Sequence, residues 1–466
     1  MNATELARLS IVQSEELGRD LRLWSIVPFV GLLTCIAVLP LCAGHWWERN
    51  RNKSLVCLLF ALPILAYLPR MGPAGVHELT LRGQEYTSFI LLLGALFVIT
   101  SGVHVGGSLA GTPLSNTALL ALGAVSANLV GTTGASVLLI RPFLRANAVR
   151  ERKVHLVVFF IFIVSNCGGV LTPLGGPPLF LGFLKGVPFG WTLRLWKEWL
   201  LVNGALLLLF NLLDQRALDA EEAAHPRSQL AAVQEHEPLR ISGGLNFLFL
   251  LGILATILGA GTGLGTAGAR WPFGWQEGAL ALLTCAAWFT TDPANRAQNR
   301  FTWGPMVEVA VLFAGIFVTM APALLILNAW SLGQREVLGA AFELERPWQF
   351  FWSTGALSSF LDNAPTYLTF TSTACGLEGV PLEGRYLAEL LARSASNGSG
   401  SQLLAAISCG AVFMGANTYI GNGPNFMVKA IAEEAGVRMP TFFGYMAYSG
   451  LILLPLFGIV TLVFFR

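Results

Sequence analysis

Two stretches of this chain share one pattern: Leu171-Thr-Pro-Leu-Gly-Gly-Pro-Pro178 and Asn417-Thr-Tyr-Ile-Gly-Asn-Gly-Pro424. Aligned, they place a Thr, a branched aliphatic residue, a Gly and a Pro at the same positions. Each stretch lies inside an apolar run long enough to cross a bilayer, and Gly and Pro both disrupt helices. Freed backbone groups at that depth are tolerated only in protein or beside a wet cavity. We therefore predict two helices broken at mid-membrane, which indicate a transporter's binding site. Proline kinks that serve only helix packing are the alternative.

The composition is that of an integral membrane protein. Hydrophobic residues make up 54% of the chain and charged residues 12%, with a mean hydropathy of +0.62. About a quarter of residues are charged in soluble domains. The long apolar runs favour helices over an outer-membrane barrel. The sequence has no basic stripe of the kind that binds nucleic acid. Its seven Cys form no CxxC pair that would indicate a metal site.

The apolar segments predict an all-α fold with about ten full spans. Two further segments, 117–140 and 348–375, have a polar centre between short apolar arms. Because each arm is too short to cross a bilayer, we predict two re-entrant hairpins. The loop at 141–153 is rich in Arg, which places it and the base of the first hairpin in the cytoplasm.

The order span, hairpin, broken helix, span occurs twice, and the basic loops give the two copies opposite orientations. These are predicted inverted repeats, whose hairpin tips approach each other near the midplane. The predicted organisation is an N-terminal segment with the first spans (1–86), repeat 1 (87–214, broken helix 154–184), a cytoplasmic linker (215–240), connecting spans (241–303) and repeat 2 (304–466, broken helix 401–433).

Asp362 lies at the centre of the second hairpin. An ionisable side chain at membrane depth is costly and by default marks an ion or proton pathway. Carboxylate, hydroxyl and carbonyl oxygens suit a small hard cation, and burial favours the protonated carboxyl. One group could then exchange a proton for a cation. The alternative is a structural Asp that caps the second arm of the hairpin.

Polar residues cluster at the same breaks, although a single Ser, Thr or Asn in a membrane helix is more often a packing hydrogen-bonder. Glu308, one turn inside the span that begins at Gly304, is a possible second proton site or an interfacial acid facing water. The predicted ion- or substrate-binding set is Asp362, Asn363, Thr366, Asn417, Thr418, Gly421, Asn422, Ser165, Asn166, Thr172, Gly175, Asn128, Thr132 and Thr133, with Asp362, Asn363 and Thr418 as Na⁺ ligands.

From about residue 87 to 465 the chain resembles the ion transporter superfamily, through its two hairpins and the paired Thr-x-Leu/Ile-Gly-x-x-Pro breaks. It is most similar to the branch of NhaD-type sodium:proton antiporters and citrate transporters, with Leu361-Asp-Asn-Ala-Pro-Thr366 in the second hairpin. The resemblance implies a homodimer that works as an elevator. It also implies sodium sites where each hairpin tip meets its broken helix, at Asn128, Thr132, Thr172 and Gly175 in one half and Asp362, Asn363, Thr418 and Gly421 in the other.

Two departures bear on the substrate. The Ser-Asn-Thr signature of dicarboxylate symporters is absent from both tips, and no Arg or Lys lies in the predicted central sites. Both departures argue against a di- or tricarboxylate as the transported substrate. The first tip also has no acid where the second has Asp362.

We therefore predict a multi-pass secondary active transporter of the inner membrane that exchanges Na⁺ or Li⁺ for protons, without catalytic residues or a resident cofactor. The alternative is a Na⁺- or H⁺-coupled carrier of citrate or another small organic anion, which a basic side chain such as Lys429 in the central cavity would favour. A membrane-embedded enzyme would instead bring Asp362 and Glu308 close together as an acid pair. The expected partners are monovalent cations and protons, or a small organic anion, and the lipid bilayer.

Overall fold

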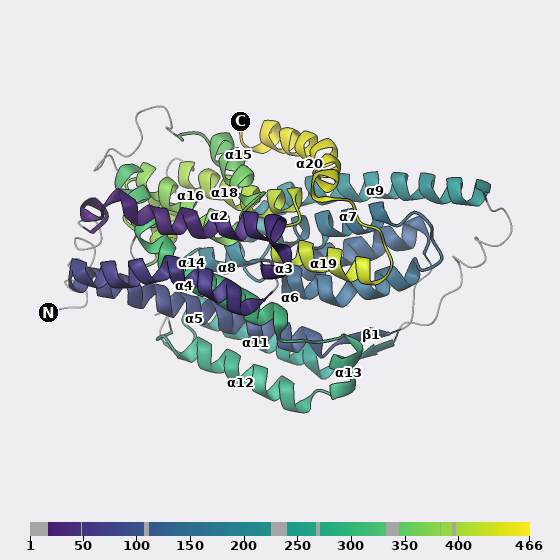
Figure 1. The fold of residues 1–466 in the computed structure, drawn as a ribbon, viewed down its shortest axis with the longest axis horizontal. Coiled ribbons are helices and arrows are strands. Elements are labelled where there is room, and N and C mark those ends of the chain that lie inside the picture. Colours follow the sequence, from purple (N-terminus) through teal and green to yellow (C-terminus); the bar gives the residue numbers. More distant parts are fainter. Residues whose placement is uncertain are drawn as a thin grey trace.

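The computed structural model describes residues 17–47, 49–106, 111–224, 240–266, 271–331, 344–382, 384–393 and 398–466. Most long helices lie along one direction, and α9 reaches one extreme of the molecule (Figure 1). The first half contains η1 (Leu23–Ile26), α2 (Val27–Cys42), α3 (Gly44–Trp47), α4 (Asn50–Tyr67), η2 (Leu68–Met71), α5 (Pro73–Ser101), β1 (His104–Gly106), α6 (Pro113–Ala146), α7 (Val154–Ile163), η3 (Cys167–Val170), α8 (Pro177–Leu184), η4 (Phe189–Leu195) and α9 (Trp196–Ala224).

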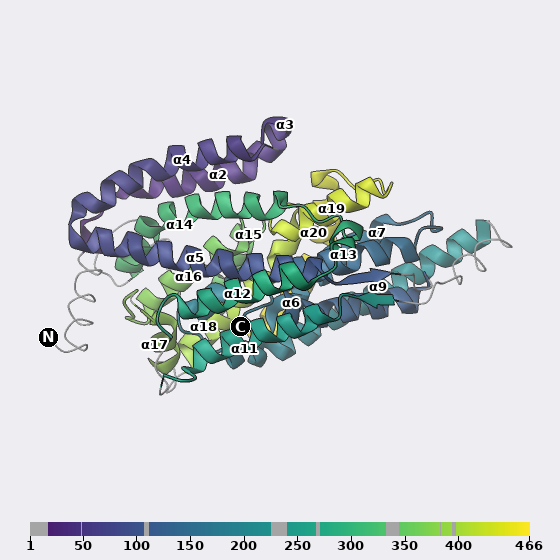
Figure 2. The same cartoon turned by 90° about the horizontal axis from the view of Figure 1, so that it is seen from below.

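The second half is also helical, apart from a short antiparallel pairing of β2 with β1. In Figure 2, α2 and α4 form an outer layer beside α14, and α11 and α12 lie on the opposite side of α5. Its elements are β2 (Arg240–Ser242), α11 (Leu245–Thr262), α12 (Trp275–Thr290), α13 (Pro293–Gln298), α14 (Gly304–Ser331), α15 (Pro347–Ser358), α16 (Asn363–Leu377), α17 (Tyr386–Arg393), α18 (Ser399–Met414), η6 (Gly415–Asn417), α19 (Gly423–Glu434) and α20 (Phe442–Phe464).

The prediction of an all-α membrane protein is confirmed. Within the described residues, nine helices are long and apolar enough to cross a membrane. They include Pro113–Ala146, which the sequence predicts as a hairpin, and Ser399–Asn417 from the second broken helix. A bundle with this many apolar helices can satisfy its backbone hydrogen bonds within each segment, as the bilayer interior requires.

Two predicted domain boundaries fall inside helices. The first is residue 86/87, because α5 begins at Pro73. The second is 214/215, because α9 continues to Ala224; the rest of the predicted linker, 225–239, lies outside the described residues. The boundary at 303/304 coincides with the start of α14.

The first predicted hairpin folds back on itself at Gly131. This residue has φ 77° and ψ 156°, which interrupts the helical conformation within α6. The Asn116 and Asn147 side chains, near the two ends of α6, exchange amide hydrogen bonds of 2.9 and 2.8 Å. In a continuous helix, residues 31 positions apart would be separated by about 46 Å, at 1.5 Å per residue. The two arms therefore run side by side.

The second predicted hairpin also folds back. Its arms are α15 and α16, and they are joined by residues 359–362. The rings of Phe350, near the start of α15, and Phe370, midway along α16, meet with their centroids 6.5 Å apart. The chain therefore reverses direction between them.

Both predicted broken helices are interrupted at the quoted stretches. In the first, α7 ends at Ile163 and α8 begins only at Pro177, with the single turn η3 between them. In the second, α18 ends at Met414 and α19 begins at Gly423, after the short turn η6. Each later half begins with a Pro at its first or second position, where the missing N–H costs nothing.

A buried ionic network fixes the base of the first hairpin. The Arg150 guanidinium pairs with Asp214 (Nη2–Oδ1 2.9 Å) and with Glu221 (Nε–Oε2 3.1 Å), both on α9. His155 and Asn116 also contact the Asp214 carboxylate, each at 2.9 Å. The Arg150 and Asp214 side chains are fully buried, so one cation holds two acids away from water.

We predict that Arg150→Met destabilises the protein by about 3–5 kcal/mol, because it leaves two buried carboxylates without their cation. Thermal unfolding in detergent measures the loss. The control is Glu389→Gln, which removes the charge of Glu389 from its exposed ion pair with Arg393 and should cost less than about 1 kcal/mol. Equal losses for the two variants would show that the network does not stabilise the fold.

Candidate functional site

The first hairpin and the first break are joined by the side chain and backbone of Asn128. The Asn128 Oδ1 accepts the Leu171 N–H at 2.8 Å, and its Nδ2 donates to the Gly168 carbonyl at 2.7 Å. The Thr172 hydroxyl donates to the Asn128 carbonyl. One turn later, the Thr132 N–H donates to the Gly175 carbonyl at 2.9 Å. The hairpin thus satisfies several freed backbone groups of the break, and Trp199 and Asn203 of α9 donate to the carbonyls of Gly168 and Cys167.

The second hairpin meets the second break in a similar way. The Thr418 hydroxyl donates to the Ser359 carbonyl, as Thr172 does to Asn128. The Asn417 Nδ2 donates to the Ser359 Oγ at 2.9 Å. The Thr418 Oγ also accepts the Gly421 N–H at 3.1 Å, so it bridges the hairpin to the backbone of the break.

Glycines allow close backbone packing within each break, and between the second break and its hairpin. A Cβ on Gly421 would lie 2.6 Å from the Gly415 carbonyl oxygen and 2.8 Å from that of Ser358. In the first half, a Cβ on Gly175 would overlap the Gly169 carbonyl. Real Cβ atoms do not approach backbone atoms this closely, so a side chain at either position would push the backbones apart.

The two breaks are also joined to each other by three buried amides. The Asn166 Nδ2 donates to the Asn425 Oδ1 at 2.7 Å, and its Oδ1 accepts from the Asn422 Nδ2 at 3.0 Å. Asn422 also donates to the Ser165 carbonyl, and Asn425 to the carbonyls of Gly415 and Thr418. Sequence positions more than 250 residues apart therefore form one polar centre, and the two predicted sites lie side by side.

Asp362 lies in the turn of the second hairpin, three residues after Ser359. It is the N-cap of α16, where its Oδ1 accepts the Ala364 N–H at 3.1 Å, so the alternative structural role is present in the fold. Among the described residues, no Lys, Arg or His forms an ion pair with it. A carboxylate at this position therefore lacks a compensating cation from the described part of the chain.

Two buried amide oxygens at the second junction have no hydrogen-bond partner in the described structure. They are the Oδ1 atoms of Asn363, in the hairpin, and Asn417, in the break. Leaving a buried acceptor unsatisfied costs about 1–3 kcal/mol. A carboxylate and neutral amide oxygens form the donor set that a hard monovalent cation prefers. The residues present therefore fit such an ion.

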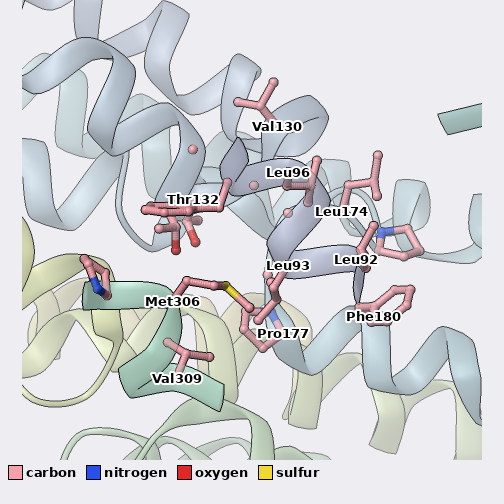
Figure 3. Close-up of a pocket in the computed structure, with 18 residues that line it drawn as sticks. Leu92, Leu93, Leu96, Val130, Thr132, Leu174, Pro177, Phe180, Met306 and Val309 are labelled. Atoms are coloured by element: carbon pink, nitrogen blue, oxygen red, sulfur yellow. The ribbon is translucent and has the colours of Figure 1, made fainter. Parts of the chain in front are cut away.

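A small cavity of about 80 Å³ opens where the first hairpin tip meets the first break. Leu92, Leu93 and Leu96 of α5 and Thr132 surround it, and Met306 and Val309 of α14 close another side (Figure 3). Thr133, Gly175 and Pro177 also line it. Its wall is mostly apolar, with hydroxyls contributed by the hairpin tip. The cavity has room for more than one water molecule, and its hydroxyls are side-chain groups that a water molecule or an ion could contact.

The structure places most of the predicted residues at these junctions and sets others apart. Thr366 donates to the Asp362 carbonyl at 3.1 Å, and Ser165 contacts Ser136 of the first hairpin at 2.8 Å. Glu308 instead pairs with Lys53 of α4 (Nζ–Oε1 2.6 Å). Lys429 pairs with Glu433 and lies over Tyr419, and it does not line the cavity at the first junction.

Sequence reasoning missed two residues of the centre. Ser359 supplies both the carbonyl and the hydroxyl that hold the second break. Asn425 supplies the amide that joins the breaks. Both were visible as polar residues in apolar runs, but neither repeats in the other half, so the comparison of the two stretches did not select them.

A bundle of apolar helices, with two folded-back hairpins seated on two broken helices around a polar centre, is the architecture of a multi-pass membrane transporter. Residues 18–465 match the family model described as "Putative citrate transport", and the chain belongs to that family. This match bears out the citrate-transport side of the resemblance, and the antiporter side stays a prediction. No curated protein matches the chain.

We predict that Gly421→Ala separates the second hairpin from its break and lowers thermal stability by about 1–3 kcal/mol, because the new methyl overlaps backbone carbonyls. Thermal unfolding in detergent measures this. The matched control is Gly423→Ala, where a Cβ meets no atom within 4 Å. The close packing of hairpin on break would be refuted if both variants unfolded at the wild-type temperature.

Proposed function

We propose that the protein is a secondary active transporter that moves a small organic anion of the citrate class, coupled to a monovalent cation or a proton. The family match over nearly the whole chain carries the choice of substrate class. No phosphate-binding loop is present in the sequence, which agrees with transport driven by an ion gradient. The two hairpins act as re-entrant segments of inverted repeats, and the polar centre between them is the transport site.

The coupling ion binds at the second junction. Asp362 supplies the charge, and the free Oδ1 atoms of Asn363 and Asn417 supply neutral ligands. The Thr418 hydroxyl holds the hairpin against the break, so movement of either element alters the site. Protonation of Asp362 would remove the charge that attracts the cation, so a proton and a cation compete for one carboxyl group.

One observation favours a second candidate, exchange of Na⁺ or Li⁺ for protons. No Lys or Arg hydrogen-bonds to the described residues of the two junctions, where an organic anion would need a positive partner. An uncompensated carboxylate alone suits a cation exchanger. The inner membrane as location and a homodimeric assembly remain part of the proposal under either function.

The deciding experiment uses purified protein in liposomes, with radiolabelled citrate outside and a pH-sensitive dye inside. We expect citrate uptake that depends on a Na⁺ or proton gradient and falls at least about 100-fold in Asp362→Asn, since an ion-coupled step loses its charged ligand. Asn preserves the N-cap, so the fold should remain.

Asp292→Asn is the matched control, because Asp292 is also an N-cap whose Oδ1 accepts the N–H two residues on. It should transport as the wild type does. Cation-dependent proton movement without citrate uptake would establish the antiporter instead. Citrate uptake that Asp362→Asn leaves intact would overturn the assignment of the coupling site.

A further inference from the structure

A second, polar cavity of about 230 Å³ lies between α5, α12 and the end of α8. Its lining includes Arg82, Glu85, Lys185 and Gln276, and none of the residues of the hairpin junctions. Arg82 lies 19 positions before Ser101, the last residue of α5, which is about 28 Å along the helix. The Ser101 end lies beside the strand whose Val105 carbonyl accepts from Arg145 of the basic loop. The cavity is therefore at the opposite end of the bundle from the predicted cytoplasmic face.

This cavity already holds one carboxylate. Glu85 lies between two cations, accepting from the Arg82 Nη1 at 2.9 Å and from the Lys185 Nζ. The Arg82 and Lys185 side chains are only 3% and 6% exposed. Arg82 is also paired with Glu78 through its Nε at 2.7 Å, so it keeps a partner if Glu85 moves away. Lys185 has no other ion pair among the described residues.

A buried donor in the same wall has no acceptor. Gln276 is 6% exposed, and its Nε2 has no hydrogen-bond partner in the described structure. The adjacent acid is satisfied, because Glu277 accepts from the Gly274 N–H at 2.8 Å and from the Ser88 hydroxyl. It sits in the first turn of α12, where the helix N-terminus offsets its charge. The wall of the cavity therefore contains a buried donor, the Gln276 Nε2, that still needs a hydrogen-bond acceptor.

We propose that this cavity binds a carboxylate group of a small organic anion, which displaces Glu85 from Lys185 and accepts from Lys185 and Gln276. The inference rests on the proposed transport of organic anions and adds a site outside the polar centre. It supplies the positive partner that the hairpin junctions lack.

The position of the cavity suits a docking site on the way to the centre. Glu85 and Ser88 border this cavity, and Leu92 and Leu96 border the smaller one. Residues three or four apart share one face of a helix, so a single face of α5 passes both cavities. On α8, Leu184 borders the polar cavity and Phe180, one turn earlier, borders the smaller one. An anion released from Lys185 would reach the first junction along this face.

The charge state of Lys185 makes the site sensitive to pH. Burial and the Arg82 guanidinium lower the pKa of Lys185 to about 8, against the opposing effect of Glu85. Among the described residues, the other titratable groups around it are Glu78 on α5, Glu277 on α12 and Tyr386 on α17. Loss of the Lys185 proton above this pH removes the attraction for a carboxylate, so the KM for citrate should rise as pH passes about 8. Lys185→Arg should abolish that rise.

The test measures the KM for citrate uptake in liposomes for two variants with opposite expected effects. Lys185→Gln should raise the KM about ten-fold or more, because a charge-assisted hydrogen bond is lost. Glu85→Gln should lower the KM, because the resident competitor loses its charge. A purely structural role for the pair would make both variants worse.

The controls are Lys429→Gln and Glu433→Gln, which break another Lys–Glu pair (Nζ–Oε1 2.8 Å) outside both cavities. We expect wild-type KM values for them. A KM shift in Lys429→Gln with none in Lys185→Gln would overturn the proposal and move the anion to Lys429. The same KM in wild type and both cavity variants would also overturn it.

A second measurement does not depend on transport. An amine-reactive reagent is applied to the purified protein, and labelling of Lys185 is quantified by mass spectrometry with and without citrate. We expect citrate to protect Lys185 and not Lys429. Failure of the proposed function would appear as no citrate uptake by the wild type. Failure of this inference would appear as normal uptake with Lys185 labelling unchanged by citrate.

Discussion

The structure depends on one constraint: every backbone group freed by a broken helix inside a bilayer must find a partner in the protein. In the first half, the Asn128 side chain bonds to the Leu171 N–H and to the Gly168 carbonyl. In the second half, Asn425 and the hydroxyls of Tyr445 and Ser449 donate to carbonyls of the break. In both halves a Thr hydroxyl of the break also donates to a carbonyl of the hairpin. Because these hydrogen bonds hold each hairpin against its break, and the Asn166–Asn425 contact joins the breaks, the polar centre is held together without a salt bridge among its described members. The hydrogen bonds of the centre join neutral groups, which leaves the Asp362 carboxylate of the second junction available for an ion.

The sequence predicts the fold well where the signal is local. Apolar runs located the helices, and the Gly–Pro stretches located both interruptions, because these depend on neighbouring residues. The start of α5 was missed, since its first half contains Glu78, Arg82 and Glu85 and reads as polar. These charges are tolerated because they pair with one another and with Lys185. Pairing with a residue about 100 positions away is invisible to a sliding window.

The candidate site was predicted only in part, because pairing between residues far apart in the sequence is again not visible. Asp362 and the two Thr residues were identified because charge and repetition are visible in sequence, whereas the pairing of Lys53 with Glu308 was not. Residue chemistry alone favoured a cation exchanger, but the family match favours an organic anion. The two views are compatible if the positive groups that an anion needs lie away from the hairpins, and Lys185 and Arg82 do lie there.

The ion pair of Lys53 with Glu308 has a consequence for biosynthesis. Lys53 is 4% exposed on α4, and its only ion-pair partner in the described structure is on α14, in the other half of the chain. When α2 and α4 first enter the membrane, that partner has not yet been made. An unpaired buried Lys in a membrane helix is costly. Lys53 is the fourth residue of α4, so until then its side chain can extend to the membrane surface. The final packing of α4 against α14 therefore forms only after the second half of the chain has been made.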